Sequence, residues 1–160
     1  MLTVSILCVG KMKEPYLIAA FEEYRKRLGA YCRFSLTEIP EQHLPEAPSE
    51  REIGAALEKE ADELEKRIPA SAALVALCVE GEQMSSPAFA RRIADWQSTG
   101  RSQLCFVVGG SCGLSPRIKR RADLRLSFSE MTFPHHLFRV MLCEQVYRAL
   151  NILGGGKYHK

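Results

Sequence analysis

The sequence has no pair of cysteines in the Cys-x-x-C spacing, although it contains six cysteines, at positions 8, 32, 78, 105, 112 and 143. Zinc sites and redox-active dithiols typically use that spacing. Most of these cysteines fall inside apolar runs, where cysteine behaves as a small hydrophobic residue. The pattern argues against a zinc site and a disulfide framework, and it predicts a protein of the reducing cytoplasm without a bound metal.

The amino terminus also lacks the basic segment that opens a secretory signal peptide, because its apolar run MLTVSILCVG begins at the first residue. The run is too short to span a bilayer. We therefore expect it to form a first strand, and we expect no association with a membrane.

A third absence concerns the glycine pattern of dinucleotide-binding folds. After Val9 the chain continues Gly10-Lys11-Met12-Lys13, with no second glycine. A Rossmann-type site requires G-x-G-x-x-G directly after the first strand and an acidic residue about 20 positions later. The sequence therefore excludes that site, and with it an open-sheet methyltransferase built in the same way.

The length and the alternation of segments predict a single α/β domain spanning residues 1–160. Charged residues make up 26% of the chain and hydrophobic residues 46%, which is typical of a globular protein. Apolar runs alternate with amphipathic segments, which favours a mainly parallel sheet with helices on both faces. We expect strands at 33–39, 72–79 and 104–108, and helices at 17–28, after Ser49 (a capping box with Glu52) and from Ser86-Pro87.

Two successive strand-and-loop units in the second half of the chain predict a ligand site. The apolar run 104–108 is followed by glycines at 109, 110 and 113, which let the backbone turn and approach a ligand. Ser115 and Pro116 then fit a helix N-cap followed by proline at the first helical position. Taken alone, this loop could also be an ordinary strand–helix turn.

The second unit is the segment 126–139, LSFSEMTFPHHLFR. Leu126 and Phe128 alternate with serines as in a half-buried strand, and Pro134 suits the first position of a helix. Residues 137–153 are apolar on nearly all sides, so we expect that helix to be buried against the sheet or a second subunit. Ligands of open α/β sheets bind outside the carboxyl ends of the strands, where the loop 129–133 would lie.

Charge is distributed unevenly along the chain. The net charge is only +3, but residues 117–125 carry +4, whereas residues 41–66 hold nine acidic and three basic side chains, or −6. We expect one end of the molecule to attract a polyanion and another to repel it. The basic residues could also form no more than a solvated helix face. The candidate RNA-binding residues are Arg117, Lys119, Arg120 and Arg121.

One alternative function is a hydrolase, because GGSCG at 109–113 matches the G-x-S-x-G nucleophile elbow. Ser111 would be followed by Asp123 and by a histidine at 135, 136 or 159 in the order Ser, Asp, His. Cys112 as a thiolate nucleophile is a variant of this mechanism. The elbow begins its helix at the serine, whereas Ser115-Pro116 places the helix start later, so the hydrolase is the weaker alternative.

Four segments of the chain resemble one known family. They are VGKMKE at 9–14, FVVGGSCGLS at 106–115, LSFSEMTFPHHLFRVMLCEQVYRA at 126–149 and the terminal KYHK. Together they are similar to the RlmH family of SPOUT-class bacterial methyltransferases, and the resemblance covers essentially the whole chain. It implies S-adenosylmethionine as cofactor and N3 of a pseudouridine in 23S rRNA, within the ribosome, as substrate. It also implies a C-terminal trefoil knot and a homodimer built on the last helix. Cys112 departs from the pattern, which favours a more polar residue there.

The resemblance also implies the residues of the cofactor pocket. Apolar side chains and free peptide groups suit adenine, and a pocket poor in lysine and arginine suits the positive sulfonium. The implied cofactor-binding residues are Leu77, Gly109, Phe128, Ser129, Glu130, Met131, Thr132 and Phe133.

The expected catalytic residues are His135, Arg139, Tyr158 and His159. A histidine can accept the proton that N3 must lose, and an arginine can stabilise the developing anion. Because Gly154–Gly156 follows the last helix, we expect a flexible hinge that lets the tail reach the partner's loop in a dimer. Glu144 fits a structural pair with Arg148, four residues later. A non-enzymatic RNA-binding protein with a vestigial pocket remains the other alternative.

Overall fold

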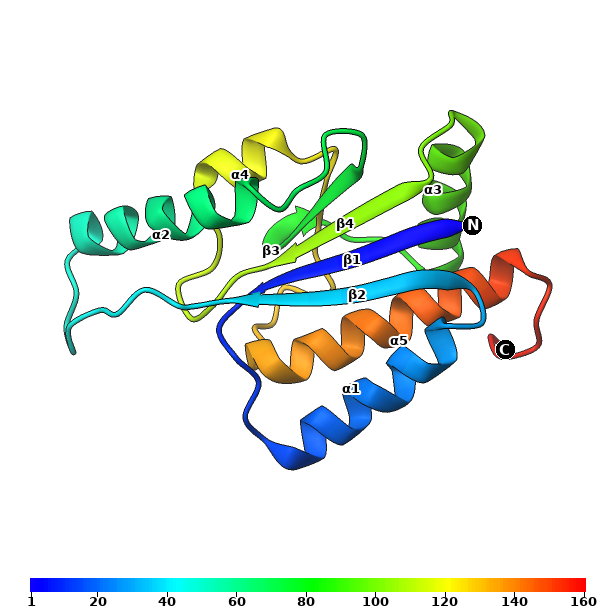
Figure 1. The fold of residues 1–160 in the computed structure, drawn as a ribbon, viewed down its shortest axis with the longest axis horizontal. Helices are drawn as coiled ribbons and strands as arrows, with labels where there is room; N and C mark the ends of the chain where they lie inside the picture. The colour runs from blue at the N-terminus through cyan, green and yellow to red at the C-terminus, as the bar shows by residue number, and fades with distance from the viewer.

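The structure is a computed structural model that describes residues 1–160, and it alternates strands with helices along the chain (Figure 1). The elements, in order, are β1 (Leu2–Val9), α1 (Pro15–Leu28), β2 (Cys32–Ile39), α2 (Glu50–Glu65), β3 (Ala73–Glu82), α3 (Ser86–Ser98), β4 (Gln103–Val108), α4 (Pro116–Arg121), β5 (Leu124–Leu126) and α5 (His135–Leu153).

The five strands form one sheet in the order β2-β1-β4-β3-β5, and every neighbouring pair is parallel. The central strands β1 and β4 pair in register from Thr3 with Gln103 to Cys8 with Val108. Both are buried along nearly their whole length, which explains why they are almost continuously apolar. The expected parallel α/β sheet is thus confirmed.

Helices cover both faces of the sheet, as expected. The connections β1–β2 and β3–β4 both step toward the β2 edge, and their helices α1 and α3 lie on one face; α2 and α4 connect strands in the opposite direction and cover the other face (Figure 1). Because crossovers between parallel strands are right-handed, connections that run in opposite directions across the sheet place their helices on opposite faces. Alternate strand residues therefore face different cores: Ile6 packs with Phe21 and Val146, whereas Leu7 packs with Leu64 and Ile118.

Several local sequence signals act as expected. Ser49 caps α2 by accepting a hydrogen bond from the amide of Glu52 at 3.1 Å, while the Glu52 carboxylate accepts one from the amide of Ser49, also at 3.1 Å. Ser115 caps α4, and its hydroxyl accepts from the amide of Arg117 at 3.1 Å. Helix α1 ends at Gly29, as expected.

The last strand and the last helix differ in their boundaries from the prediction. β5 ends at Leu126, so Phe128 is not in a strand. The Ser127 hydroxyl donates to the carbonyl of Ser129 at 3.0 Å and turns the chain away from the sheet. Pro134 is the N-cap of α5, and the first helical residue is His135.

Helix α5 packs between α1 and α3 on one face of the sheet, and its residues Leu142, Cys143, Val146 and Ala149 are fully buried. Its other side is not covered, since Leu137 and Leu153 are 38% and 40% exposed. None of the helices combines the length and apolar character needed to cross a membrane.

Candidate active site

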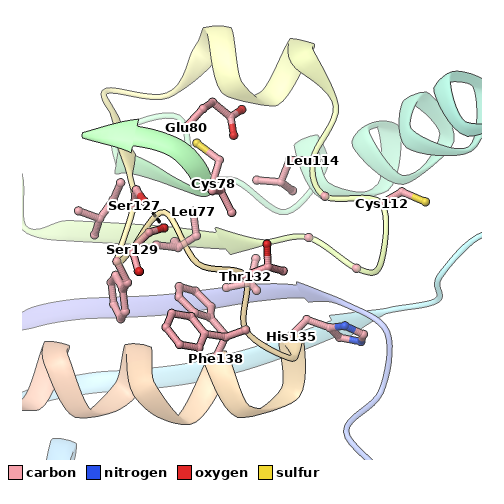
Figure 2. A pocket seen from close by; sticks show the side chains of 18 of the residues that line it. Leu77, Cys78, Glu80, Cys112, Leu114, Ser127, Ser129, Thr132, His135 and Phe138 are labelled. Atoms are coloured by element: carbon pink, nitrogen blue, oxygen red, sulfur yellow. Dashed lines mark hydrogen bonds between the residues drawn. The ribbon is translucent and has the colours of Figure 1, made fainter. Parts of the chain in front are cut away.

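A cavity of about 340 Å³ opens at the carboxyl ends of β3, β4 and β5 (Figure 2). The loop Gly109–Leu114 forms one wall, and the loop Ser127–Phe133 forms another. Phe138 of α5 and Leu77 of β3 add apolar surface. Both predicted loops therefore meet at one site, at the edge of the sheet where open α/β folds bind ligands.

The glycine loop is tightly folded on itself. A Cβ atom at Gly109 would lie 2.3 Å from the carbonyl oxygen of Gly113, and Gly110 and Gly113 form an isolated β-bridge. Glycine at 109 is therefore required by the neighbouring backbone, and not by ligand approach as the sequence suggested. A side chain there would displace the whole wall of the cavity.

Glu41 fastens this glycine loop from outside. Its carboxylate oxygen Oε1 accepts hydrogen bonds from the amide of Ser111 at 3.0 Å and from the Ser111 hydroxyl at 2.6 Å. Partial burial works to raise the pKa of Glu41, but these two bonds outweigh it and the pKa is lowered. Glu41 is therefore anionic at neutral pH and holds the loop in place.

The loop after β5 is stiffened by its own serines. Ser127 is buried and bonds the Ser129 carbonyl, and the Ser129 hydroxyl accepts from the amide of Met131 at 3.0 Å. The two serine hydroxyls thus bond backbone groups two residues further on, in place of the backbone hydrogen bonds that a strand would provide. The peptide groups and the apolar side chains that follow are consequently held at the rim of the cavity.

Most of the residues expected at the cofactor pocket line this cavity. They are Leu77, Gly109, Phe128, Ser129, Met131, Thr132 and Phe133, whereas Glu130 does not line it. Sequence reasoning missed other lining residues, notably Cys78, Glu80, Leu114, Lys119 and Phe138 (Figure 2). Cys78 and Glu80 come from β3 and Lys119 from α4, where no ligand motif points to them. Leu114 and Phe138 lie inside the two segments that predicted the site, but nothing in those segments marked them as lining residues.

Lys119 contradicts the expectation of a wall without cations, but its charge is matched. Its ammonium group bonds the carboxylate of Glu80, which also lines the cavity. The Lys119 hydrogen bond and a backbone hydrogen bond lower the pKa of Glu80. This wall therefore carries a neutralised lysine rather than a free cation.

A second, polar cavity of about 590 Å³ adjoins the first. It is lined by Lys11 and Lys13 after β1, by Glu38 and Glu41 at and after the end of β2, and by two histidines of α5. His135 is the only side chain that lines both cavities. The imidazole of His135 thus stands at the junction between an apolar and a polar site.

The two histidines differ in their surroundings. His136 Nδ1 lies 2.7 Å from Oε2 of Glu14, an ion pair when the ring is protonated. The His135 ring contacts His136 edge-on, with 4.4 Å between centroids. Burial and the neighbouring His136 lower the pKa of His135, against a smaller opposing effect of Glu41. His135 is therefore neutral at physiological pH and can accept a proton.

Arg139 takes a different position from the one expected of a catalytic residue. Its side chain is fully buried and donates to Glu38 at 2.7 Å and to the carbonyls of Val9 and Gly10 at 3.0 and 2.7 Å. It lines neither cavity. Arg139 therefore fixes the carboxyl ends of β1 and β2 beneath the site, and it does not reach a substrate in this conformation.

The tail is folded back on α5 rather than free, contrary to the expected hinge. Gly156 donates its amide to the carbonyl of Asn151 at 2.9 Å, and the Tyr158 amide donates to the Asn151 side chain at 3.1 Å. The Tyr158 hydroxyl donates to Glu144 at 3.0 Å, and Glu144 forms the predicted pair with Arg148 at 2.7 Å.

This arrangement keeps Tyr158 and His159 of a chain away from its own cavities. His159 Nδ1 lies 3.3 Å from Nη1 of Arg148, in the carboxyl-terminal half of α5, whereas His135 begins that helix. At 1.5 Å per residue, Asn151 is about 24 Å along the helix from His135. The structure does not bring the four expected catalytic residues together within one chain.

The hydrolase alternative is wrong in its geometry. The Ser111 hydroxyl donates its hydrogen bond to Glu41 and forms none with a histidine. Asp123 bonds the amide of Leu74 at 2.8 Å, near the amino end of β3, and pairs with Arg101 at 2.7 Å. The serine and the aspartate thus lie at opposite ends of the sheet, and no catalytic triad forms. Cys112 is exposed and precedes the start of α4 by four residues.

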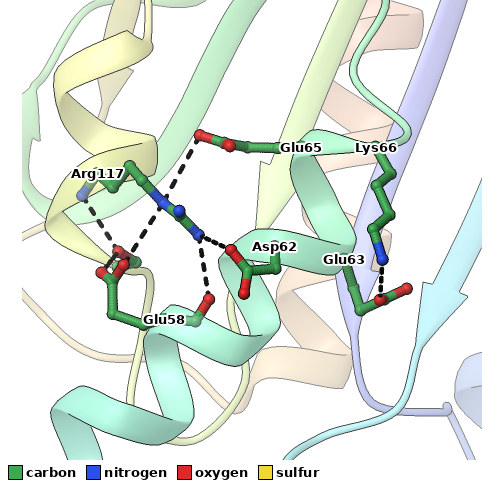
Figure 3. Close-up of polar contacts among 7 residues, drawn as sticks. Glu58, Asp62, Glu63, Glu65, Lys66 and Arg117 are labelled. Atoms are coloured by element: carbon green, nitrogen blue, oxygen red, sulfur yellow. Dashed lines mark hydrogen bonds and ion pairs between the residues drawn. The ribbon is translucent and has the colours of Figure 1, made fainter.

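The expected separation of basic and acidic ends is also wrong, because helix α4 packs on the acidic helix α2 (Figure 3). Arg117 lies 2.7 Å from Asp62, 3.5 Å from Glu58 and 3.7 Å from Glu65. Lys119 is paired with Glu80, as described above. Arg120 and Arg121 form no ion pair, so only half of the predicted RNA-binding cluster has cations available.

Comparisons with known proteins agree with this geometry. Residues 2–159 match the family described as "Predicted SPOUT methyltransferase". A protein named "Ribosomal RNA large subunit methyltransferase H" from Bifidobacterium animalis subsp. lactis is 46% identical over 99% of this chain and 100% of its own length. A protein of the same name from Clostridium botulinum strain 657 has the same identity and coverage.

A solved structure, that of a probable methylase family protein from Haemophilus influenzae Rd KW20, has a TM-score of 0.56 to this chain at 11% sequence identity. The two structures align over the whole of this chain and 72% of the Haemophilus chain, which shows a shared fold. Because the family match spans nearly every residue, the chain belongs to the SPOUT methyltransferase family.

Proposed function

We propose that this chain is an S-adenosylmethionine-dependent methyltransferase that methylates N3 of a pseudouridine in 23S rRNA. The observation that carries the proposal is an apolar cavity joined, through the single side chain His135, to a polar one. One cavity suits the cofactor and the other suits a polar substrate. The curated relatives named for large-subunit rRNA methylation match the chain over its whole length, which supports the same substrate here.

The cavity between the two loops fits the proposed cofactor. Leu77, Leu114 and Phe133 offer apolar surface to adenine, and the peptide groups of the serine-stiffened loop offer donors and acceptors at its edge. The Glu80–Lys119 ion pair has no net charge, so this wall does not repel a positive sulfonium. When bound, S-adenosylmethionine supplies an electrophilic methyl group.

The chain's own contribution is to orient the acceptor and to remove its proton. Neutral His135, at the junction of the cavities, accepts the N3 proton of the substrate. Glu14 orients the adjacent His136 ring through its 2.7 Å contact. Holding the two reactants in line lowers the free-energy barrier of such a displacement by about 7–11 kcal/mol.

The proposed enzyme acts as a homodimer in the cytoplasm, where its ribosomal substrate is found. The uncovered side of α5, with Leu137 and Leu153 exposed, supplies the interface. Tyr158 and His159 lie far from the cavities of their own chain, so they contribute to catalysis only by reaching the partner's site. Arg120 and Arg121, which have no ion pair, contact the phosphate backbone.

Methyl transfer to RNA tests this function directly. The purified chain is incubated with radiolabelled S-adenosylmethionine and either free 23S rRNA or 70S ribosomes from cells that lack its gene. We expect label in RNA, recovered as 3-methylpseudouridine after nuclease digestion and mass spectrometry. RNA binding without any methyl transfer, and without cofactor affinity, would instead favour the non-enzymatic RNA-binding protein.

A further inference from the structure

We propose that the polar cavity is the acceptor-nucleotide site and that Lys11 and Lys13 bind the phosphates on either side of the target base. The inference rests on the proposed function, because it assigns the apolar cavity between the two loops to the cofactor. It goes beyond that function by assigning a second set of residues to RNA, on a segment remote from the basic helix α4.

The segment that carries the two lysines is rigidly held. Arg139 donates to the carbonyls of Val9 and Gly10, and the amide of Met12 donates to Glu38 at 2.7 Å. The Met12 side chain is buried in the core. Because Met12 points inward, the lysines on both sides of it are exposed at the cavity, and both line it.

The charges of these lysines are available. Neither ammonium group forms an ion pair or a hydrogen bond within the chain. Of the carboxylates in the same cavity, Glu38 is paired with Arg139, and Oε1 of Glu41 accepts two hydrogen bonds from Ser111, so neither is paired with these lysines. By contrast, Lys119 and Arg117 are neutralised by acidic neighbours. Lys11 and Lys13 are therefore the unpaired cations that lie beside His135.

The remaining walls suit the base of the nucleotide. The cavity volume of about 590 Å³ lies within the range of roughly 300–1,000 Å³ that small-ligand sites show. Neutral His135 and the Oε2 oxygen of Glu41, which accepts no hydrogen bond within the chain, are acceptors at this cavity, and they suit a base edge that presents N–H groups. A pseudouridine ring has two N–H groups, at N1 and N3, where uridine has only one.

Single substitutions that remove one positive charge test this site. Lys11→Gln and Lys13→Gln keep most of the side-chain length, and both positions are exposed, so the fold is not at risk. Lys26→Gln is the matched control, because Lys26 is an exposed lysine without an ion pair near the other end of α1. Each protein is assayed for methylation of 70S ribosomes at several KCl concentrations, and for cofactor affinity by calorimetry.

We expect each cavity variant to raise KM for RNA about tenfold, the effect of losing one hydrogen bond to a charged group. The slope of log KM against log salt should fall by about 0.7 for each lysine, and cofactor affinity should not change. The Lys26→Gln protein should match the unaltered chain. If the cavity variants behave like Lys26→Gln while the unaltered chain methylates RNA, the acceptor site is wrong and the function stands. If the unaltered chain transfers no methyl group, both are overturned.

Discussion

The residues that the sequence suggested for catalysis lie at the start of α5 and in the tail that packs against its carboxyl-terminal half, and these two regions are built in opposite ways. At the amino-terminal end, His135 lines two cavities, and the ion pair of Arg139 with Glu38 is buried beneath them. At the carboxyl-terminal end, Glu144, Arg148 and Tyr158 satisfy one another at the surface. The first end presents a group to a ligand, whereas the second end fastens the tail.

The comparison shows that a polar residue in a motif is available only if the fold leaves it without a partner. Arg139 lies one helical turn after His135, and the two positions look alike in sequence. Three hydrogen bonds use the guanidinium of Arg139, whereas the His135 ring faces open cavities. The following predictions test this difference, starting from the largest effect.

Arg139→Met should give the largest loss of stability. The substitution leaves Glu38 without its partner and two backbone carbonyls without a donor, so we expect the free energy of unfolding to fall by about 3–5 kcal/mol. Urea denaturation measures the change. Arg148→Met is the matched control at the other end of α5; that pair is partly exposed, and its loss should cost less than about 1 kcal/mol. Equal losses in the two variants would contradict the comparison.

His135→Ala should lower turnover by ~100-fold or more, the usual contribution of a general base. Folding stability and the dissociation constant for S-adenosylmethionine should change little, because His135 only borders the cofactor cavity. Steady-state methylation and calorimetry provide the two readouts. His43→Ala is the control, since His43 is exposed and lines neither of these cavities. Normal turnover without the His135 ring would remove it from the mechanism.

Removing the last three residues after Lys157 should also lower turnover by about 100-fold, although the tail is remote from the cavities of its own chain. The proposed reason is that the tail completes the partner's site. Mixing the truncated chain with the His135→Ala chain tests this, because a mixed dimer contains one site with both an intact tail and an intact histidine. Recovery of activity on mixing is expected, and a mixture as inactive as its components would restrict the tail to a structural role.

The pH dependence should follow the lowered pKa of His135. Burial and His136 lower this pKa, while Glu41, Arg139 and Glu14 exert smaller effects of either sign. The rate should therefore rise with pH through a value below 6.5 and level off above it. For stability, a depressed folded pKa means that the unfolded chain binds more protons, so this contribution is present above 6.5 and is lost as pH falls. A rate that still rises above pH 7 would contradict the assignment of His135.

Tyr158→Phe should have the smallest effect on stability, about 1 kcal/mol at most, because it removes one partly exposed hydrogen bond to Glu144. Burial and the Glu144 carboxylate raise the pKa of Tyr158 to about 12, so the hydroxyl remains a donor throughout the working range of pH. Thermal unfolding of the variant and the parent chain gives the difference. A much larger loss would mean that the tail supports the core of the fold.

The sequence predicted most of the fold, because its signals are local. Apolar runs gave the buried strands, and Ser49 with Glu52 gave a capping box that the structure contains. The end of β5 was missed, since Ser127 bonds the Ser129 carbonyl and interrupts a pattern that looked like a strand. The trefoil knot stays a prediction of the family resemblance.

The candidate site was predicted only in part, because much of it depends on contacts between distant segments. The loop 129–133 was predicted from its strand-and-helix context, and most of its residues line the cavity. The pairing of Glu41 with Ser111 and of Arg117 with α2 joins residues more than 50 positions apart. No local sequence pattern predicts such pairs. The sequence therefore overestimated how many cations of α4 are free to bind RNA, and it did not predict the polar cavity.

A crystal structure of the chain soaked with S-adenosylmethionine tests the central claim most directly. The account predicts the cofactor between Gly109–Leu114 and Ser127–Phe133, with its methyl group directed at His135 and the polar cavity left free for the acceptor. Cofactor bound in the polar cavity beside Lys11 and Lys13, or away from both loops, would contradict it.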